Sequence, residues 1–163
     1  MTINCFPLDY ATDDGDLTIE GVVSGVPMRC AAWAVVDLTP LWLPAMQRGR
    51  NRIIPGASGM IVNRRRKTQT LHPLTLVVSG GTDLNGNPYT DVWDGLYQNM
   101  LYLKQQVFDP PGGSAVSRTA VLTLPDASTL TAEVQIEDVS AVDRKGPVHI
   151  YTMDLILPMG EFS

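Results

Sequence analysis

One segment of this chain has the apolar spacing of an α-helix, and its contrast with the rest of the sequence constrains the fold. The apolar residues of this segment recur at intervals of three and four, which places them on one helical face: Trp93, Leu96, Met100, Leu103 and Val107. Tyr97 widens this face. Thr90 or Asp91 is a suitable N-cap, and the Pro–Pro–Gly–Gly run after Asp109 ends the helix. The sequence therefore predicts one long helix, from the N-cap to Phe108, that lies across a sheet.

The other ordered segments alternate apolar and polar residues with the period of two that half-buried β-strands require. We expect strands over residues 17–26, 28–36, 70–79, 117–124, 130–137 and 148–157. Residues 41–43 lie between two prolines and are expected to be extended rather than helical. Short turns join successive strands, which favours antiparallel pairing. The predicted fold is mainly β, a single domain over residues 1–163, with an antiparallel β-sandwich or partial barrel and one flanking helix.

Charge is segregated along the chain. No acidic residue occurs from Leu38 to Thr82, yet this stretch holds seven of the twelve basic residues. The remainder carries all 17 acids against five bases, so a segment of charge +7 is joined to a body of charge −12. This distribution predicts a cationic surface that meets an acidic one.

Residues 46–68 contain all seven of these bases and are too polar and too rich in glycine and proline to supply a core. A loop of this length inside a compact domain is uncommon unless it is functional or disordered. Two interpretations are open: a mobile excursion, or a β-hairpin arm that becomes ordered against a partner. The arm is favoured because the apolar runs Ile53–Ile54 and Met60–Val62 flank a Pro–Gly turn.

No motif indicates catalysis, a cofactor or a metal. The sequence has no nucleophile elbow, no phosphate-binding glycine loop directly before the helix, and no zinc-protease motif. Cys5 and Cys30 match no metal or disulfide pattern, and His72 and His149 are far apart. We therefore expect no enzymatic activity, no cofactor and no metal site. No apolar run approaches the ~20 residues that span a bilayer, so no membrane association is expected.

The basic run Arg64–Lys67 raises the possibility of nucleic-acid binding, which the surrounding sequence disfavours. No aromatic residue occurs between residues 45 and 70 to stack on bases, and the net charge is −5. Self-association explains both halves of the charge distribution. The predicted subunit-contact residues are Arg48, Arg50, Arg52, Ile53, Ile54, Arg64, Arg65, Arg66 and Lys67. The predicted acidic partners, or residues lining a channel, are Asp9, Asp13, Asp14, Asp16, Glu133 and Glu137.

The order of elements resembles the tail-tube fold of long-tailed bacteriophages. The Pro–Gly–Ala–Ser–Gly turn at residues 55–59, the arginines 64–66 and the strand 74–80 ending in glycine are similar to the N-terminal domain of phage distal tail proteins. The helix segment 95–103 and the closing segment 153–158 also resemble that domain. The resemblance covers residues 17 to 160.

This resemblance implies a structural virion protein that forms hexameric rings, stacked to conduct DNA as passing cargo. It implies that one sheet of each subunit joins an inner barrel, that the long loop contacts the adjacent ring, and that an acidic channel wall keeps DNA from sticking. Other phage tail proteins would be partners, with assembly in the host cytoplasm. The tail-tube subunit is the first interpretation, a distal tail or tail terminator ring the second. A non-viral β-sandwich module that binds a ligand is the alternative of another class.

Overall fold

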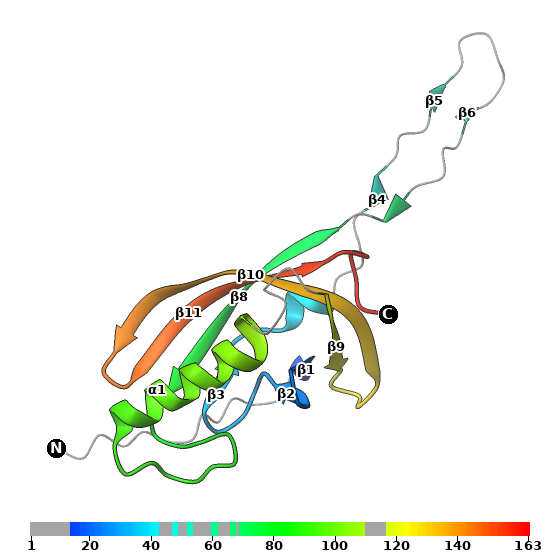
Figure 1. Ribbon diagram of the computed structural model, residues 1–163. Coiled ribbons are helices and arrows are strands. Elements are labelled where there is room, and N and C mark those ends of the chain that lie inside the picture. The colour runs from blue at the N-terminus through cyan, green and yellow to red at the C-terminus, as the bar shows by residue number, and fades with distance from the viewer. Residues whose placement is uncertain are drawn as a thin grey trace.

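The computed structural model describes residues 14–42, 47–48, 52–53, 60–61, 66–67, 69–109 and 117–163. Seven strands form one sheet in the order β2-β1-β9-β10-β11-β8-β3, and every neighbouring pair is antiparallel. The strands are β1 (Asp16–Glu20), β2 (Gly25–Pro27), β3 (Trp33–Val35), β8 (Thr70–Ser79), β9 (Arg118–Thr123), β10 (Thr129–Lys145) and β11 (Val148–Leu157). With one helix beside this sheet, the predicted mainly β fold is confirmed (Figure 1).

The two edges of this sheet come close together, because the residues that follow β2 turn back and bond to β3, with an isolated bridge between Arg29 and Ala34. The backbone N–H of Val35 donates to the carbonyl of Met28 (3.0 Å), and that of Cys30 donates to Trp33 (2.8 Å). The sheet must bend for its edges to come together, and β10 contributes to this bend. The first part of β10 pairs with β9 and its second part pairs with β11. Two register shifts in β10 let this long strand bend from one half of the sheet to the other.

An ion pair locks the place where the edges meet. The Arg29 side chain is only 7% exposed, and its guanidinium donates to both carboxylate oxygens of Asp14 and to the carbonyls of Gly15 and Val35. Asp14 also accepts the backbone N–H of Leu38 (2.9 Å). The hydrogen bonds from Arg29, with that from Leu38, hold the pKa of Asp14 below its usual range. The start of β1 and the end of β3 are thereby tied together.

The helix begins and ends where the sequence predicts. The α-helix α1 (Val92–Leu103) is capped by Asp91, whose side chain accepts the N–H of Trp93, and a π-helical turn, Lys104–Phe108, continues it. The predicted apolar face is only partly right. Leu96, Leu103 and Val107 are buried and Met100 is partly buried, as predicted, but Trp93 and Tyr97 are exposed.

The helix is rotated from the predicted orientation because backbone, rather than large side chains, packs at its first turns. A Cβ on Gly95 would lie 2.3 Å from the carbonyl oxygen of Gly80 and 2.5 Å from the ring of Tyr89. One turn later, the buried Asn99 side chain donates to the carbonyls of Ser79 (2.7 Å) and Thr82 (2.9 Å). These contacts fix α1 on the end of β8.

Several strand predictions need correction. Residues 17–26 form the hairpin β1–β2 rather than one strand, and only Trp33–Val35 of the run 28–36 is a strand. Residues 41–43 were expected to be extended, but a 3₁₀ turn covers Thr39–Trp42 and buries Leu41, with its proline at a position where the ring does not disrupt the turn. In addition, β10 extends to Lys145, eight residues beyond the predicted end, because it continues to pair with β11.

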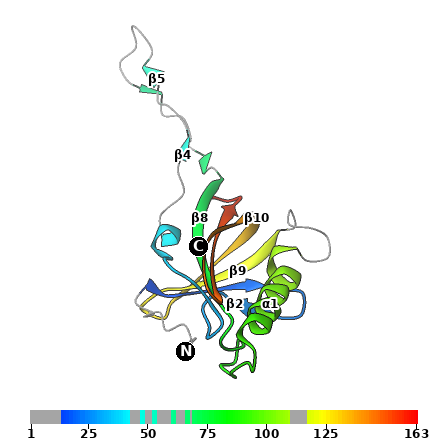
Figure 2. The same cartoon turned by 90° about the vertical axis from the view of Figure 1, so that its left-hand side faces the viewer.

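Four two-residue strands belong to the segment 46–68. β4 (Gln47–Arg48) pairs antiparallel with β7 (Arg66–Lys67), and β5 (Arg52–Ile53) pairs antiparallel with β6 (Met60–Ile61). The pair β5–β6 lies between β4 and β7 in the sequence, which is the pairing order of a single hairpin. Both ribbon views place β4 and β5 beyond the end of β8, away from the seven-stranded sheet (Figures 1 and 2). We call residues 46–68 the arm.

The first prediction concerns the close contact between helix and strand. Glycine to alanine within a helix normally stabilises it by about 1 kcal/mol. We expect Gly95→Ala to destabilise the protein instead, by about 1–3 kcal/mol, because the new methyl group overlaps the Gly80 carbonyl. Urea unfolding followed by circular dichroism measures the change. The control is Gln98→Ala, an exposed position on the same helix, which should change stability by less than about 0.5 kcal/mol. Equal or higher stability of Gly95→Ala would contradict the packing.

The second prediction concerns Asp14. We expect Asp14→Asn to destabilise the fold by about 3 kcal/mol at pH 7, since it leaves Arg29 as a buried charge without its partner. The folded-state pKa of Asp14 is lowered, so its contribution is complete above the unfolded pKa of about 3.9 and is lost as the pH falls below it. The wild type and the variant should therefore converge in stability below about pH 4.

Thermal unfolding across a pH series tests this convergence. Asp109→Asn is the control, because this aspartate is exposed and should change stability by less than about 0.5 kcal/mol. A gap between wild type and Asp14→Asn that is the same at pH 3 and pH 7 would show that the ion pair does not carry the effect.

Candidate functional site

A free strand edge is the most conspicuous candidate for assembly. Residues Thr129–Val134 of β10 pair with β9, and from Gln135 to Lys145 the only strand paired with β10 in the described part of the chain is β11. An edge with unpaired N–H and C=O groups is a template for pairing with another chain. The free edge of β10 runs from Glu137 to Lys145, and it is long enough for such pairing.

The same ribbon is exposed on its faces. Residues Ser140–Lys145 of β10 are all exposed, including Val142 at 63%, and Val148–Thr152 of β11 are only partly buried. The core lies under the other end of these strands, around Met153 and Leu155. The tip of the β10–β11 hairpin therefore combines an unpaired strand edge with exposed faces, and this combination suits binding to another chain.

Among the described residues, a second free edge lies on the opposite side of the ribbon β10-β11-β8. Residues 70–74 of β8 pair with β11, while β3 pairs only with residues 76–78. Pro73 lies in this stretch, and proline suits an edge position because it has no N–H to donate. Two free edges on opposite sides of one ribbon allow copies to join head to tail.

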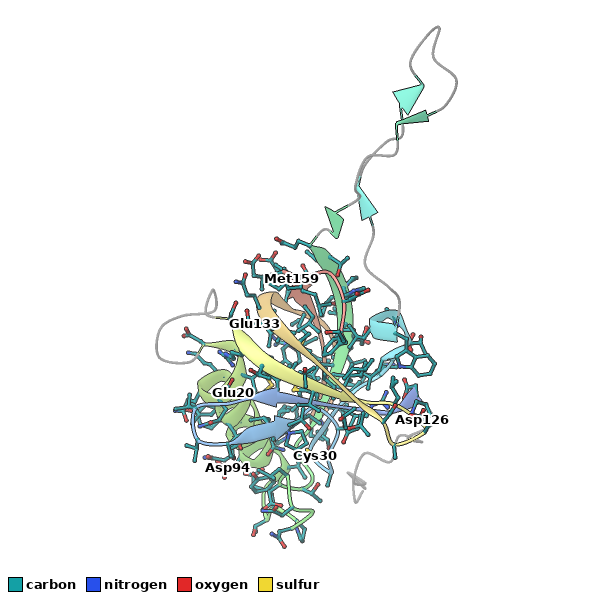
Figure 3. The ribbon with its side chains drawn as sticks, turned by 90° about the vertical axis from the view of Figure 1, so that its right-hand side faces the viewer. Glu20, Cys30, Asp94, Asp126, Glu133 and Met159 are labelled. Carbon is teal, nitrogen blue, oxygen red and sulfur yellow. The ribbon has the colours of Figure 1, made fainter. Side chains whose placement is uncertain are left out.

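The predicted acidic residues are placed apart from one another. Asp14 is already paired with Arg29 inside the chain, and Asp16 lies at the start of β1, where burial raises the pKa of its carboxyl group. Glu133 and Glu137 are exposed on β10, Glu137 on the free edge. Figure 3 shows Glu133 on the part of the body nearest to β4–β7. The structure does not bring these acids into one cluster, and Asp9 and Asp13 lie outside the described residues.

The predicted basic contact residues all belong to the arm. Arg48, Arg52, Ile53, Arg66 and Lys67 lie in the strands β4, β5 and β7, which are described by their backbone alone. The remaining predicted contacts lie outside the described residues: Arg50, Ile54, Arg64 and Arg65. Their contacts with other subunits stay a prediction.

The sequence-based reasoning missed two exposed aromatic residues. Trp93 is 57% and Tyr97 is 61% exposed, one helical turn apart, and both were assigned to the buried face. The sequence contained a sign of this orientation. Gly95 and Asn99 are four residues apart, as Trp93 and Tyr97 are, and they mark an alternative helix face that can pack closely against a strand. Asp94 lies between the two aromatic residues and is also exposed. We call Trp93, Asp94 and Tyr97 the aromatic turn.

Other chemistry has little support in the described residues. They contain no group of three or more histidine, cysteine or acidic side chains that could hold a metal ion. The loop at residues 80–88 is rich in Asp, Asn and Gly, as calcium-binding loops are, but it is closed by its own hydrogen bonds, because the Asp83 carboxylate accepts the N–H groups of Asn85 and Asn87. These bonds lower the pKa of Asp83. Among the described helices, none has the length and apolarity to cross a membrane.

Two hollows lined by described residues are open to solvent. A groove of about 400 Å³ lies between the end of the helix and the bend of β10, lined by Phe108, Asp109 and residues 136–139. A smaller hollow of about 240 Å³ lies beside Trp33, Tyr89 and Tyr102. Trp33 and Tyr102 stack with ring centroids 5.6 Å apart, so this second hollow is bounded by core packing.

Comparison with known proteins supports the fold. No protein-family model matches the sequence, and no curated protein matches it significantly. Among solved structures, the Dit (gp 19.1) protein of phage SPP1, described as a paradigm of the hub adsorption apparatus in phages that infect Gram-positive bacteria, is similar with a TM-score of 0.54 and 14% identity. The match covers 88% of this chain and 50% of that protein, so the chain spans about half of its length.

A chain from the virion of a native gene transfer agent particle is also similar, with a TM-score of 0.41 and 7% identity, over 96% of this chain and 99% of that one. This second likeness is too distant to carry an argument. The first is a likeness of fold: the chain shares its architecture with a phage adsorption-apparatus protein, as the resemblance in the sequence implies. The narrower identification as a tail-tube protein stays a prediction.

Proposed function

We propose that this chain is a structural tail protein of a phage or phage-like particle, whose copies form rings that stack into a tube conducting DNA. The observation that carries the proposal is the ribbon β10-β11-β8 with its two free edges on opposite sides. The Dit-like fold and the hairpin pairing in the arm support it. The number of six copies per ring comes from the resemblance to tail proteins.

The two edges suit a ring because they differ. Residues 137–145 of β10 in one copy would pair with residues 70–74 of β8 in the next, and the same contact would repeat until the ring closes. The two edges are offset along the strands, as in closed barrels, where neighbouring strands are staggered. Strand addition supplies main-chain hydrogen bonds, and the exposed faces of the β10–β11 tip supply side-chain contacts.

A distal tail ring is the second candidate, and the likeness to SPP1 Dit favours it. Both candidates require rings; they differ in whether identical rings stack on one another without limit. A ligand-binding module is the alternative of another class, and the open groove beside Phe108 would be its site. A monomer at high protein concentration would favour this alternative.

The third prediction tests lateral pairing. Val142 is exposed on the free edge, and a lysine on an edge strand discourages pairing with another strand. We expect Val142→Lys to keep the wild-type unfolding temperature within about 2 °C, since the side chain contributes little to the core. It should fail to form rings in negative-stain electron micrographs, where the wild type forms them.

The matched control is Val23→Lys, at an 86% exposed position in the turn between β1 and β2. This variant should form rings like the wild type. Rings of Val142→Lys that are as abundant as those of the wild type would contradict pairing through β10. A wild-type chain that remains monomeric at high concentration would contradict the proposed function itself.

The fourth prediction tests the arm. Arg64→Glu combined with Arg65→Glu should leave rings intact and impair their stacking. Raised salt should also impair stacking of the wild type, because the Debye length falls from ~10 Å at 0.1 M to ~3 Å at 1 M. Deletion of Arg52–Arg65 should leave a folded protein that no longer stacks, because this segment lies outside the seven-stranded sheet.

Sedimentation velocity across a salt series measures these effects. Arg64→Lys combined with Arg65→Lys is the control, which keeps the charge and should stack like the wild type. Stacks that persist or lengthen at 1 M salt would show that charge does not hold the rings together. They would favour a repulsive acidic channel as the main use of the acids.

A further inference from the structure

We infer that the aromatic turn, Trp93, Asp94 and Tyr97, is the surface that receives the arm of a second copy of this chain. The inference rests on the proposed function and names the acceptor of the arm, which the charge distribution alone leaves open. According to this inference, the arm binds residues on the first turns of α1 rather than Glu133 and Glu137.

The first observation is the exposure of two large aromatic side chains in one place. Trp93 is 57% and Tyr97 61% exposed, and they are four positions apart on one helix, so they lie on neighbouring turns of the same face. The orientation is fixed by the contact of Gly95 with Gly80 and by the hydrogen bonds of Asn99. The aromatic side chains therefore face solvent because the opposite side of the helix is committed to β8.

The second observation is chemical complementarity. Asp94 lies three residues before Tyr97 and so neighbours it on the helix surface, and the arm carries seven bases with no acid from Leu38 to Thr82. A guanidinium group can stack on an indole or phenol ring and donate hydrogen bonds to a nearby carboxylate. The arm contains no aromatic residue of its own between residues 45 and 70. The arm thus supplies the cationic groups, and the aromatic turn supplies the carboxylate and the aromatic rings.

The third observation is position. Figure 3 shows Asp94 at the end of the body far from β4–β7, while Met159 lies at the end nearest to them. Figures 1 and 2 also place α1 and the strands β4 and β5 at opposite ends of the molecule. The arm of one copy and the aromatic turn of the next would meet when copies follow one another in the same orientation. Such a contact does not close on itself and so builds a stack.

Glu133 fits this role less well because of where it lies. It is exposed on β10, on the part of the body nearest to β4–β7 of its own chain (Figure 3). In a stack of equally oriented copies, this part would face away from the incoming arm. Glu137 lies on the free edge that the proposed ring contact uses.

The fifth prediction is a charge reversal with rescue, in the full chain. We expect Asp94→Arg to form rings and to reduce their stacking constant at least about tenfold, since the lost contact is repeated around each ring. Arg65→Glu added to Asp94→Arg should restore stacking in part. Trp93→Ala combined with Tyr97→Ala should reduce stacking without rescue by Arg65→Glu. Sedimentation velocity separates rings from stacks, and thermal unfolding verifies that each variant is folded.

The matched controls are Glu133→Arg, the same charge change at the other end of the body, and Val23→Ala, the loss of an exposed apolar side chain elsewhere. Both should stack like the wild type. If Asp94→Arg stacks like the wild type, or if Glu133→Arg impairs stacking and is rescued by Arg65→Glu, the inference is wrong while the proposed function stands. If the wild type forms no rings, the proposed function fails and this inference fails with it.

Discussion

The contact between the backbones of Gly80 and Gly95 determines where the helix lies, and the placement of the exposed surfaces follows from it. No side chain fits on either glycine without overlap with the opposite backbone. The buried amide of Asn99 then satisfies two carbonyl groups of the chain leaving β8, which would be costly to bury unpaired. The helix is thereby held on one part of the sheet. Trp93 and Tyr97 are turned toward solvent, and the tip of the β10–β11 hairpin stays uncovered.

The free edge of β10 and the exposed aromatic side chains would make a monomeric protein prone to aggregation. A free edge of nine residues in β10 and a pair of exposed aromatic side chains both favour association with other chains. In the proposed assembly each has a separate use. The strand edges join copies laterally through main-chain hydrogen bonds, and the arm and aromatic turn join rings along the axis. Salt should affect the second contact much more than the first, because only the second depends on charge.

Charge is used inside the molecule as well as on its surface. Arg29 is one of only five bases outside the arm, and it is buried where the two edges of the sheet meet. Its partner Asp14 comes from the acidic N-terminal segment and was predicted to be an acidic partner of another subunit or to line a channel. A list of charged residues cannot separate such a structural pair from a contact residue. The distinction requires the pairing of β1 with β2 and the turn from Arg29 back to β3, which bring residues 14, 29 and 35–38 together.

The sequence by itself determined the fold class and most element positions. Alternation placed β8, β9 and β11 nearly residue for residue, and the N-cap and the Pro–Pro–Gly–Gly run delimited the helix. These features are local, so neighbouring residues suffice to specify them. Only the tertiary structure decided which side of the helix is buried and how far β10 extends. It also decided that Asp14 is already paired with Arg29. All three features depend on contacts between segments far apart in the chain. Trp93 is the clearest case: hydrophobicity predicts burial, but the close approach of two glycines leaves the aromatic side chain outside.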